Sequence, residues 1–225
     1  MAKADLRIDW ATHAAAKYAC ENWHYSGCIP KSKIVKFGIW ESNLYKGAIV
    51  YGVGATSNLV KTYGLGQNEG CELVRIALKD HDAEVSRIIA ISLMLLKKNF
   101  RGLRLVVSFA DPEQGHHGGV YQASGWLFSG NSMASNEYIY KGKRWQGRSF
   151  RNSFKGMENH PDVQTVKGSS KHRYLMPLDA AMRAQIQPLS KPYPKRVKQA
   201  MAGVQPEQRR GSTDPHAPKD KANAG

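Results

Sequence analysis

Reactive side chains are most concentrated in a glycine-rich segment, residues 108–130, which follows an apolar run. Open α/β sheets place their ligands where such strands end, so this segment is a candidate catalytic loop. We expect Asp111 to act there as a general base, with Ser108 and Tyr121 beside it. The alternative is a turn in which Asp111 caps the backbone and the neighbouring histidines face solvent.

A second group of reactive side chains, His24 and Tyr25, lies in a short loop that follows Trp23. Aromatic rings can stack on an extruded base, and an imidazole can carry a proton next to it. His24 and Tyr25 are therefore candidate positioning groups. The alternative is a loop that is anchored by the packing of its own rings.

The paired histidines at 116 and 117 also raise a metal-site hypothesis. Neighbours in an extended chain point to opposite sides, so at most one of them would bind a given ion. We take His116 and His24 as candidate ligands, with Tyr25, Asp111 or Glu72 as further donors. Imidazole combined with carboxylate or phenolate suits iron or another transition metal.

Positive charge is concentrated toward the C-terminal part of a chain whose formal charge is +15. Residues 141–175 contain nine Lys and Arg against two acidic residues, and residues 188–225 contain eight against three. Clustered positive charge is typical of proteins that bind nucleic acids. The alternative is a tail that only increases solubility.

Five basic side chains in residues 141–175 are interleaved with Trp and Phe: Lys143, Arg144, Arg148, Arg151 and Lys155. We expect them to contact DNA phosphates while the aromatic rings stack on bases or insert as wedges. The alternative is a solvated basic loop whose rings cover the edge of the core.

Charged residues also lie on the elements that lead to the candidate loop. Glu72 and Arg75 belong to a predicted core strand, where a charge is costly unless it is paired or functional. Ser86 and Arg87 belong to the first turn of a predicted helix, where free amide groups help to bind phosphate. The alternative is a structural ion pair between Glu72 and an arginine.

The elements that position these residues can be read from the hydrophobic pattern. The pattern predicts helices over 12–23, 85–99 and 118–124, and strands over 34–41, 44–52, 71–78, 103–109, 126–129, 138–140 and 172–175. This order predicts an α/β fold, with a mixed sheet flanked by helices. We expect one domain over 1–187, including the basic segment 141–175, and a basic disordered tail over 188–225.

Several protein classes are excluded by what the sequence lacks. It contains no apolar run long enough to span a membrane and no secretory signal. Its three cysteines, Cys20, Cys28 and Cys71, match no disulfide scaffold or zinc motif. We therefore expect a cytoplasmic protein with reduced thiols. The sequence leaves open whether the protein is a monomer or a homodimer.

Long strings of the sequence resemble the Mom family of phage DNA-modification proteins. They are NWHYSGCIPKSK, CELVRIALKDH, EVSRII and LRLVVSFADPEQGHHGGVYQASGW. The resemblance implies an acetyltransferase-like (GNAT-type) fold in a bacterial host cell. It also implies conversion of adenine in DNA to N6-methylcarbamoyladenine, which protects phage DNA from restriction, with acetyl-CoA and iron as cofactors.

The resemblance also implies roles for individual residues. The strand around Val74 and Arg75 would bind pantetheine through its backbone, and Tyr121 would protonate the departing thiolate. The glycine-rich loop that normally binds pyrophosphate in this fold is replaced by KDHDAEVSRI, so Ser86, Arg87 and helix amides would take its place.

The resulting hypothesis is an enzyme that binds double-stranded DNA and extrudes adenine, because the amino group is hidden in the duplex. Two alternatives remain. One is an ordinary CoA-dependent N-acetyltransferase acting on a protein or small amine. The other is a non-catalytic DNA-binding module.

Overall fold

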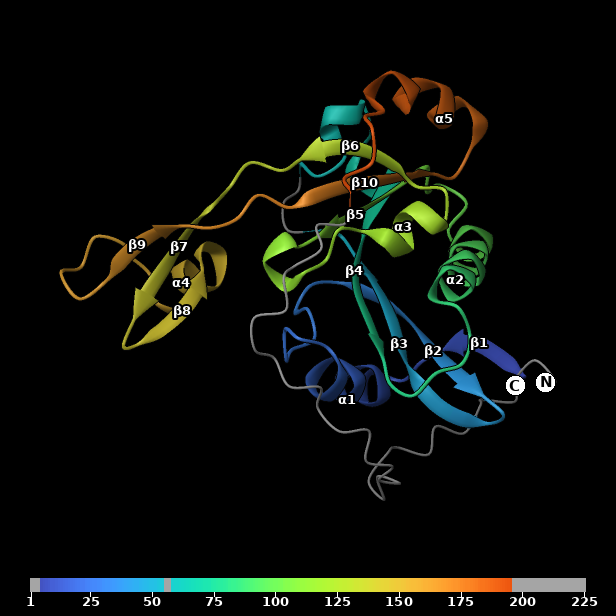
Figure 1. Ribbon diagram of the computed structural model, residues 1–225, viewed down its shortest axis with the longest axis horizontal. Coiled ribbons are helices and arrows are strands. Elements are labelled where there is room, and N and C mark those ends of the chain that lie inside the picture. The colour runs from blue at the N-terminus through green and yellow to red at the C-terminus, as the bar shows by residue number, and fades with distance from the viewer. Residues whose placement is uncertain (1–4, 55–57, 196–225) are drawn as a thin grey trace.

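The computed structural model describes residues 5–54 and 58–195. Its centre is a seven-stranded mixed sheet in the order β1-β2-β3-β4-β5-β10-β6 (Figure 1). Neighbouring strands run antiparallel except β4 and β5, which are parallel. The strands are β1 (Leu6–Trp10), β2 (Ile34–Glu41), β3 (Leu44–Gly52), β4 (Gly70–Leu78), β5 (Leu105–Ala110), β6 (Leu127–Asn131) and β10 (His172–Pro177).

Helices cover both faces of this sheet. The apolar side of α2 packs with Val106 of β5 on one face, while α5 packs against Leu105 and Val107 on the other. Small residues on α1 allow it to approach β3 closely. The helices are α1 (His13–Trp23), α2 (Val85–Asn99), α3 (Gly119–Ala123) and α5 (Ala180–Ile186), with 3-10 turns η1 (Lys61–Tyr63), η2 (Gln67–Glu69), η3 (Pro112–Gln114) and η4 (Gln187–Leu189).

The parallel pair β4 and β5 separates partway along its length. The two strands pair from Gly70 opposite Leu105 as far as Leu73 opposite Ser108, and β4 then continues to Leu78 paired with β3 but not with β5. On its other side, β4 has an extra residue, Val74, where its register with β3 shifts. Such bulges bend a strand and leave a residue out of the ladder. From Val74 onward, β4 therefore has no strand partner on the side facing β5.

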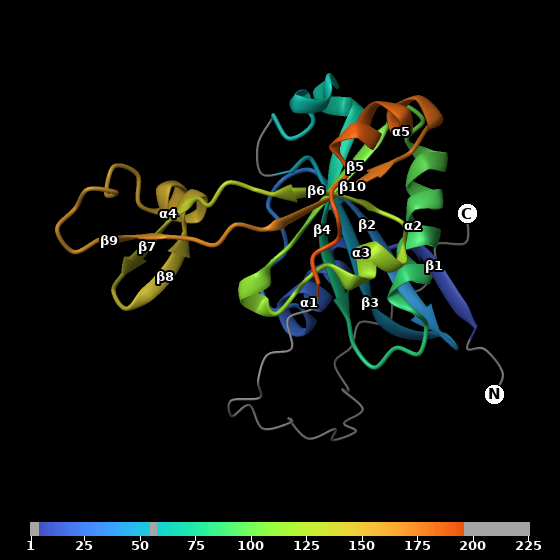
Figure 2. The same ribbon diagram turned by 45° about the horizontal axis from the view of Figure 1, so that its top comes forward.

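A small second sheet projects from the main body (Figures 1 and 2). We call residues 132–171 the basic lobe. It contains β7 (Asn136–Tyr140), β8 (Lys143–Gln146), β9 (Gln164–Lys167) and α4 (Gly147–Ser153), with strand order β8-β7-β9. Two extended segments connect it to β6 and β10, and they are joined by backbone hydrogen bonds, including one of 2.8 Å from Ser132 N to Lys171 O.

The aromatic residues of the basic lobe pack against one another. Phe150 is fully buried and stacks on Tyr138 with ring centroids 4.6 Å apart, while Phe154 lies 5.2 Å from Trp145. The expectation that these rings stack on bases is therefore wrong for Phe150. The alternative, a solvated loop whose rings cover the edge of the main core, is not observed either, because the rings pack in a small core between the strands and helix of the lobe itself.

Most predicted elements are confirmed. Thr12 caps α1 by accepting a hydrogen bond from the Ala15 amide, and Ser42 and Asn43 form the turn between β2 and β3 with positive φ angles. Strands β1, β8 and β9 and helices α4 and α5 were not predicted.

The chain beyond α5 does not separate from the domain at residue 188, where we expected the tail to begin. The Lys191 amide donates to Phe128 O at 2.9 Å, and the Tyr193 hydroxyl donates to Trp126 O at 2.7 Å. Residues 188–195 are therefore part of the folded domain. The rest of the expected tail, 196–225, lies outside the described residues.

The remaining expectations concern membranes and thiols. No helix among residues 5–54 and 58–195 is long and apolar enough to cross a membrane. Cys20, Cys28 and Cys71 are all free thiols, and only Cys28 is exposed.

Candidate functional site

A hydrogen-bonded chain lies where β4 and β5 separate. The Ser108 Oγ atom is 2.9 Å from Leu73 O and 2.8 Å from the Tyr121 hydroxyl. A carbonyl can only accept, so the chain is satisfied when Tyr121 donates to Ser108 and Ser108 donates to Leu73. The sequence placed Ser108 and Tyr121 in one site, and the structure brings them into contact.

Burial controls the protonation of Tyr121. The side chain belongs to the same core cluster as the apolar residues of α2 and packs against Trp126, and burial raises the pKa of its hydroxyl to about 12. The hydrogen bond with Ser108 opposes this increase only in part. Tyr121 is therefore protonated at neutral pH, which is the form that a proton donor to a leaving group needs.

Tyr25 is an exposed ring held between two histidines. Its ring centroid lies 4.3 Å from that of His24 and 5.5 Å from that of His116, which belongs to the loop after β5. The two reactive loops of the sequence therefore meet. An exposed aromatic ring of this kind offers a flat surface on which a base can stack.

His24 is held as a neutral imidazole. The Ser26 amide donates to its Nδ1 atom at 3.1 Å, so Nδ1 accepts and the proton is on Nε2. Burial, the positive charge of Arg75 and the proximity of His116 together lower the pKa of His24 to about 4, and burial is the largest cause. At neutral pH the ring is therefore a hydrogen-bond donor through Nε2, while its basic Nδ1 atom is bound by Ser26.

Titration of His24 should therefore depart clearly from that of an ordinary histidine. Its pKa is lowered in the folded state, so its contribution to stability is complete above pH 6.5 and is lost as the pH falls toward 4. We expect an NMR titration midpoint near 4, and a higher midpoint in Arg75→Met, which removes a neighbouring charge. A midpoint near 6.5 in the unchanged protein would contradict the burial of this ring.

The residues around Tyr25 offer two imidazoles and a phenol as possible metal ligands. The rings of His24 and His116 both contact the Tyr25 ring, which brings these members of the metal hypothesis into one place. Within residues 5–54 and 58–195, no three His, Cys, Asp or Glu side chains are placed to hold a metal ion. Iron sites in proteins commonly add a carboxylate to two histidines. Iron therefore stays a prediction from the resemblance.

Asp111 is held firmly at the start of the same loop. Its carboxylate accepts from the Glu113 amide at 3.1 Å and lies 3.0 Å from Lys171 Nζ and 3.4 Å from Ser169 Oγ. It is only 8% exposed and caps η3. The capping role that the sequence left open is thus observed. The described partners of the carboxylate are Glu113, Ser169 and Lys171, and they include neither Tyr25 nor Tyr121.

The segment between β4 and α2 differs from a glycine-rich phosphate loop. Glu41, which is buried, accepts the amides of Asp82 and Ala83 at 2.8 and 2.7 Å. Burial opposes its ionisation, but these two amides outweigh it and hold the pKa of Glu41 below its usual value. The amides of Asp82 and Ala83 are therefore bonded to Glu41 and not available to bind an anion. Ser86 and Arg87 lie in the first turn of α2, as expected.

Arg75 and Cys28 extend the site along β4. The Arg75 guanidinium donates from Nε to Cys28 O at 3.4 Å and from Nη1 to Val74 O at 2.9 Å. Arg75 therefore ties the loop of Tyr25 to the bulged strand. The sequence singled out Arg75 and Val74 but not Cys28. Glu41 and Lys171 were also missed, although a glutamate that ends an apolar strand is a signal of a specific partner.

The basic residues of the lobe differ in their surroundings. Arg144 is bound by Glu137 and also lies 3.6 Å from Glu113, while Lys143 lies over the Trp145 ring. Arg151 and Lys155 are exposed. Arg148 belongs to α4, and its side chain lies outside the described part of the structure.

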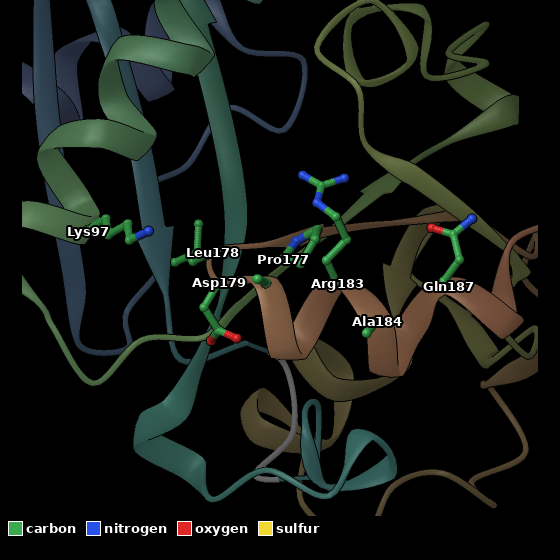
Figure 3. Close-up of a pocket in the computed structure, with 8 residues that line it drawn as sticks. Lys97, Pro177, Leu178, Asp179, Arg183, Ala184 and Gln187 are labelled. Carbon is green, nitrogen blue, oxygen red and sulfur yellow. The ribbon is translucent and has the colours of Figure 1, made fainter.

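Hollows elsewhere on the surface do not coincide with this cluster. One of about 520 Å³ lies between the end of α2 and α5, where Lys97 and Arg183 line it (Figure 3). Another of about 400 Å³ lies near Cys71 and Leu96. The candidate site is thus marked by strand separation and side-chain chemistry.

A model of the Mom protein family matches residues 5–195. No curated protein matches the chain.

Solved acetyltransferases resemble the chain at low identity. One from Chromobacterium violaceum, a probable GNAT-family member, has a TM-score of 0.46 at 10% identity and covers 79% of this chain and 84% of its own. One from Bacillus subtilis in complex with CoA has 0.40 at 12%, covering 79% and 100%. One from Elizabethkingia anophelis with acetyl-CoA bound has 0.38 at 12%, covering 78% and 100%. The likeness concerns the fold alone. The predicted α/β fold, with a mixed sheet flanked by helices, is confirmed by the strand order and helices of the structure.

Proposed function

Because the chain belongs to the Mom protein family, we propose that it is a transferase that modifies adenine in double-stranded DNA, forming N6-methylcarbamoyladenine. One observation carries the proposal beyond family membership. An exposed Tyr25 ring is flanked by two imidazoles, and it is close enough to Tyr121, the partner of Ser108, to influence the pKa of the Tyr121 hydroxyl electrostatically. This arrangement supports a site that holds a flat base beside a proton donor.

The β4 edge supports an acyl donor with a pantetheine arm. β5 pairs with β4 only as far as Leu73, and the Val74 carbonyl accepts from Arg75 Nη1, so we propose that the arm pairs with the β4 backbone beyond Val74 on the β5 side. Acetyl-CoA would supply an acyl carbon activated as a thioester. We propose that Ser86 and Arg87, rather than the amides taken by Glu41, approach its phosphates.

Tyr121 supplies one of the proton transfers. Adenine's amino nitrogen forms a bond to the acyl carbon as the carbon–sulfur bond breaks, and Tyr121 gives its proton to the departing sulfur. The amine becomes strongly acidic once its lone pair is used, and water takes the released proton, because His24 already has a proton on Nε2 and its Nδ1 is bound by the Ser26 amide. This transfer alone forms N6-acetyladenine. The methylcarbamoyl group has a further nitrogen between methyl and carbonyl, and its insertion is a two-electron oxidation that requires a hydroxylamine-level nitrogen donor, or ammonia with a separate oxidant. The residues of the site supply neither, so they account for the acyl transfer alone.

The function is tested by mass spectrometry of nucleosides from the DNA of cells that express the protein. We expect a methylcarbamoylated adenosine, and its loss in Tyr25→Ala. An N6-acetyl adenosine would instead identify simple acyl transfer. Unmodified nucleosides together with an acetylated protein or small amine would identify an ordinary acetyltransferase. Unmodified nucleosides with retained DNA binding would identify a binding module.

A further inference from the structure

The loop that carries His116 is joined to the basic lobe by two ion pairs. Asp111 Oδ2 lies 3.0 Å from Lys171 Nζ, and Glu113 Oε1 lies 3.6 Å from Arg144. Both acids belong to the loop after β5, and both cations belong to the lobe. The pair formed by Asp111 is the better shielded, with side-chain exposures of 11% and 32%.

The strand register fixes the first of these pairs. His172 of β10 lies opposite Ala110 of β5, so Lys171 and Asp111 are the next cross-strand neighbours. The Lys171 amide also donates to Ser132 Oγ at 3.0 Å, which ties it to the other connecting segment of the lobe. Lys171 is thus held where the lobe joins the main sheet.

Asp111 connects Lys171 to the candidate site, because it also holds the loop that carries His116. Its backbone carbonyl accepts from the amides of Gln114 and His116, each at 3.1 Å, and its side chain accepts from the Glu113 amide. The loop between Asp111 and His116 is therefore folded around this residue. The His116 ring in turn contacts Tyr25.

We propose that Lys171 and Asp111 form a positioning pair, which fixes the basic lobe relative to the base-binding site around Tyr25. The inference rests on the proposed function. It makes Lys171 a structural partner of Asp111 rather than a phosphate ligand, and it removes Asp111 from the role of general base that the sequence indicated. DNA that is bound to the lobe is then held at a fixed distance and orientation relative to the base-binding site.

The experiment compares Lys171→Met, Asp111→Asn and the double variant in cells that carry a plasmid. The measurement is the rate at which modified adenosine accumulates in plasmid DNA, relative to protein level. We expect each single change to lower this rate by about 100-fold, as a displacement near 1 Å can do. The double variant should be no worse than either single variant, because both remove the same interaction. Lys171→Arg should keep most of the rate.

Binding of the purified variants to a DNA duplex separates positioning from phosphate contact. We expect the Kd of Lys171→Met for the duplex to stay within about twofold of that of the unchanged protein. The slope of log K against log salt should also stay close to that of the unchanged protein. A matched control is Arg104→Met, which breaks the ion pair with Asp179, another carboxylate that caps a helix. This control should lose comparable stability and keep the modification rate.

Three results would overturn the inference. A normal rate in Lys171→Met would show that the pair positions nothing. A much lower rate in Asp111→Asn than in Lys171→Met would return Asp111 to catalysis, and a lower salt slope in Lys171→Met would make it a phosphate ligand. If the unchanged protein leaves DNA unmodified, the proposed function itself fails.

Discussion

Replacing Tyr121 by Phe is expected to lower the rate of adenine modification by about two to four orders of magnitude. The hydroxyl is protonated, since its pKa is about 12, and it lies 2.8 Å from Ser108 at the point where β4 and β5 separate. Phe keeps the ring packing against Trp126 and removes only the proton donor. The readout is the amount of modified adenosine in cellular DNA.

A matched control for this change is Tyr51→Phe. Tyr51 is also buried and also bonds a serine, with 2.6 Å between its hydroxyl and Ser92 Oγ, but it lies outside the candidate site. Both variants should lose roughly 1 kcal/mol of folding free energy. Only Tyr121→Phe should lose activity, and near-normal modification in that variant would leave the Ser108 and Tyr121 pair a purely structural one.

Neutralising four basic residues of the lobe is expected to weaken duplex binding on the order of 10³-fold at about 0.1 M salt. The residues are Lys143, Arg148, Arg151 and Lys155. The slope of log K against log salt should fall by about 3 to 4, since each lost phosphate contact removes close to one counterion. Arg144 is left unchanged because Glu137 and Glu113 already bind it.

The control for this variant removes the same charge from the main body. Four exposed lysines outside the lobe serve this purpose: Lys17, Lys61, Lys97 and Lys98. Loss of net charge alone would weaken binding equally in both variants. An effect confined to the lobe variant identifies the lobe as the DNA-binding surface, and an unchanged salt slope in it would remove the lobe from the interface.

The main sheet could be predicted because its elements have strong local patterns. The turn at Ser42 and Asn43 follows two alternating strands, and α2 has apolar residues at helical spacing, so each element is recognisable without its neighbours. The basic lobe could not be predicted in the same way. Strands β8 and β9 have four residues each, and their polar sequences become strands by pairing with β7, while Trp145 of β8 packs on Phe154.

The sequence predicted which residues belong to the candidate site better than it predicted the role of each residue. His24, Tyr25 and His116 were identified by residue type, and the structure brings them together. The role of Asp111 depends on Lys171, which is far away in the sequence and becomes its neighbour only through the pairing of β5 with β10. A capping carboxylate and a free one have the same local sequence, so this distinction needs the sheet topology.

The insertion of the lobe between two adjacent strands has a consequence for how the protein can diverge. β6 and β10 stay paired in the main sheet whatever is built between them, and the lobe brings its own aromatic core around Phe150. Substitutions on the lobe's outer surface can therefore accumulate without disturbing the core of the main sheet. On the proposed function, the preferred DNA sequences could then drift between relatives while the reaction stays the same, and exchanging this insertion between relatives would retarget the enzyme. Such an exchange would have to preserve two ion pairs, Lys171 with Asp111 and Arg144 with Glu113.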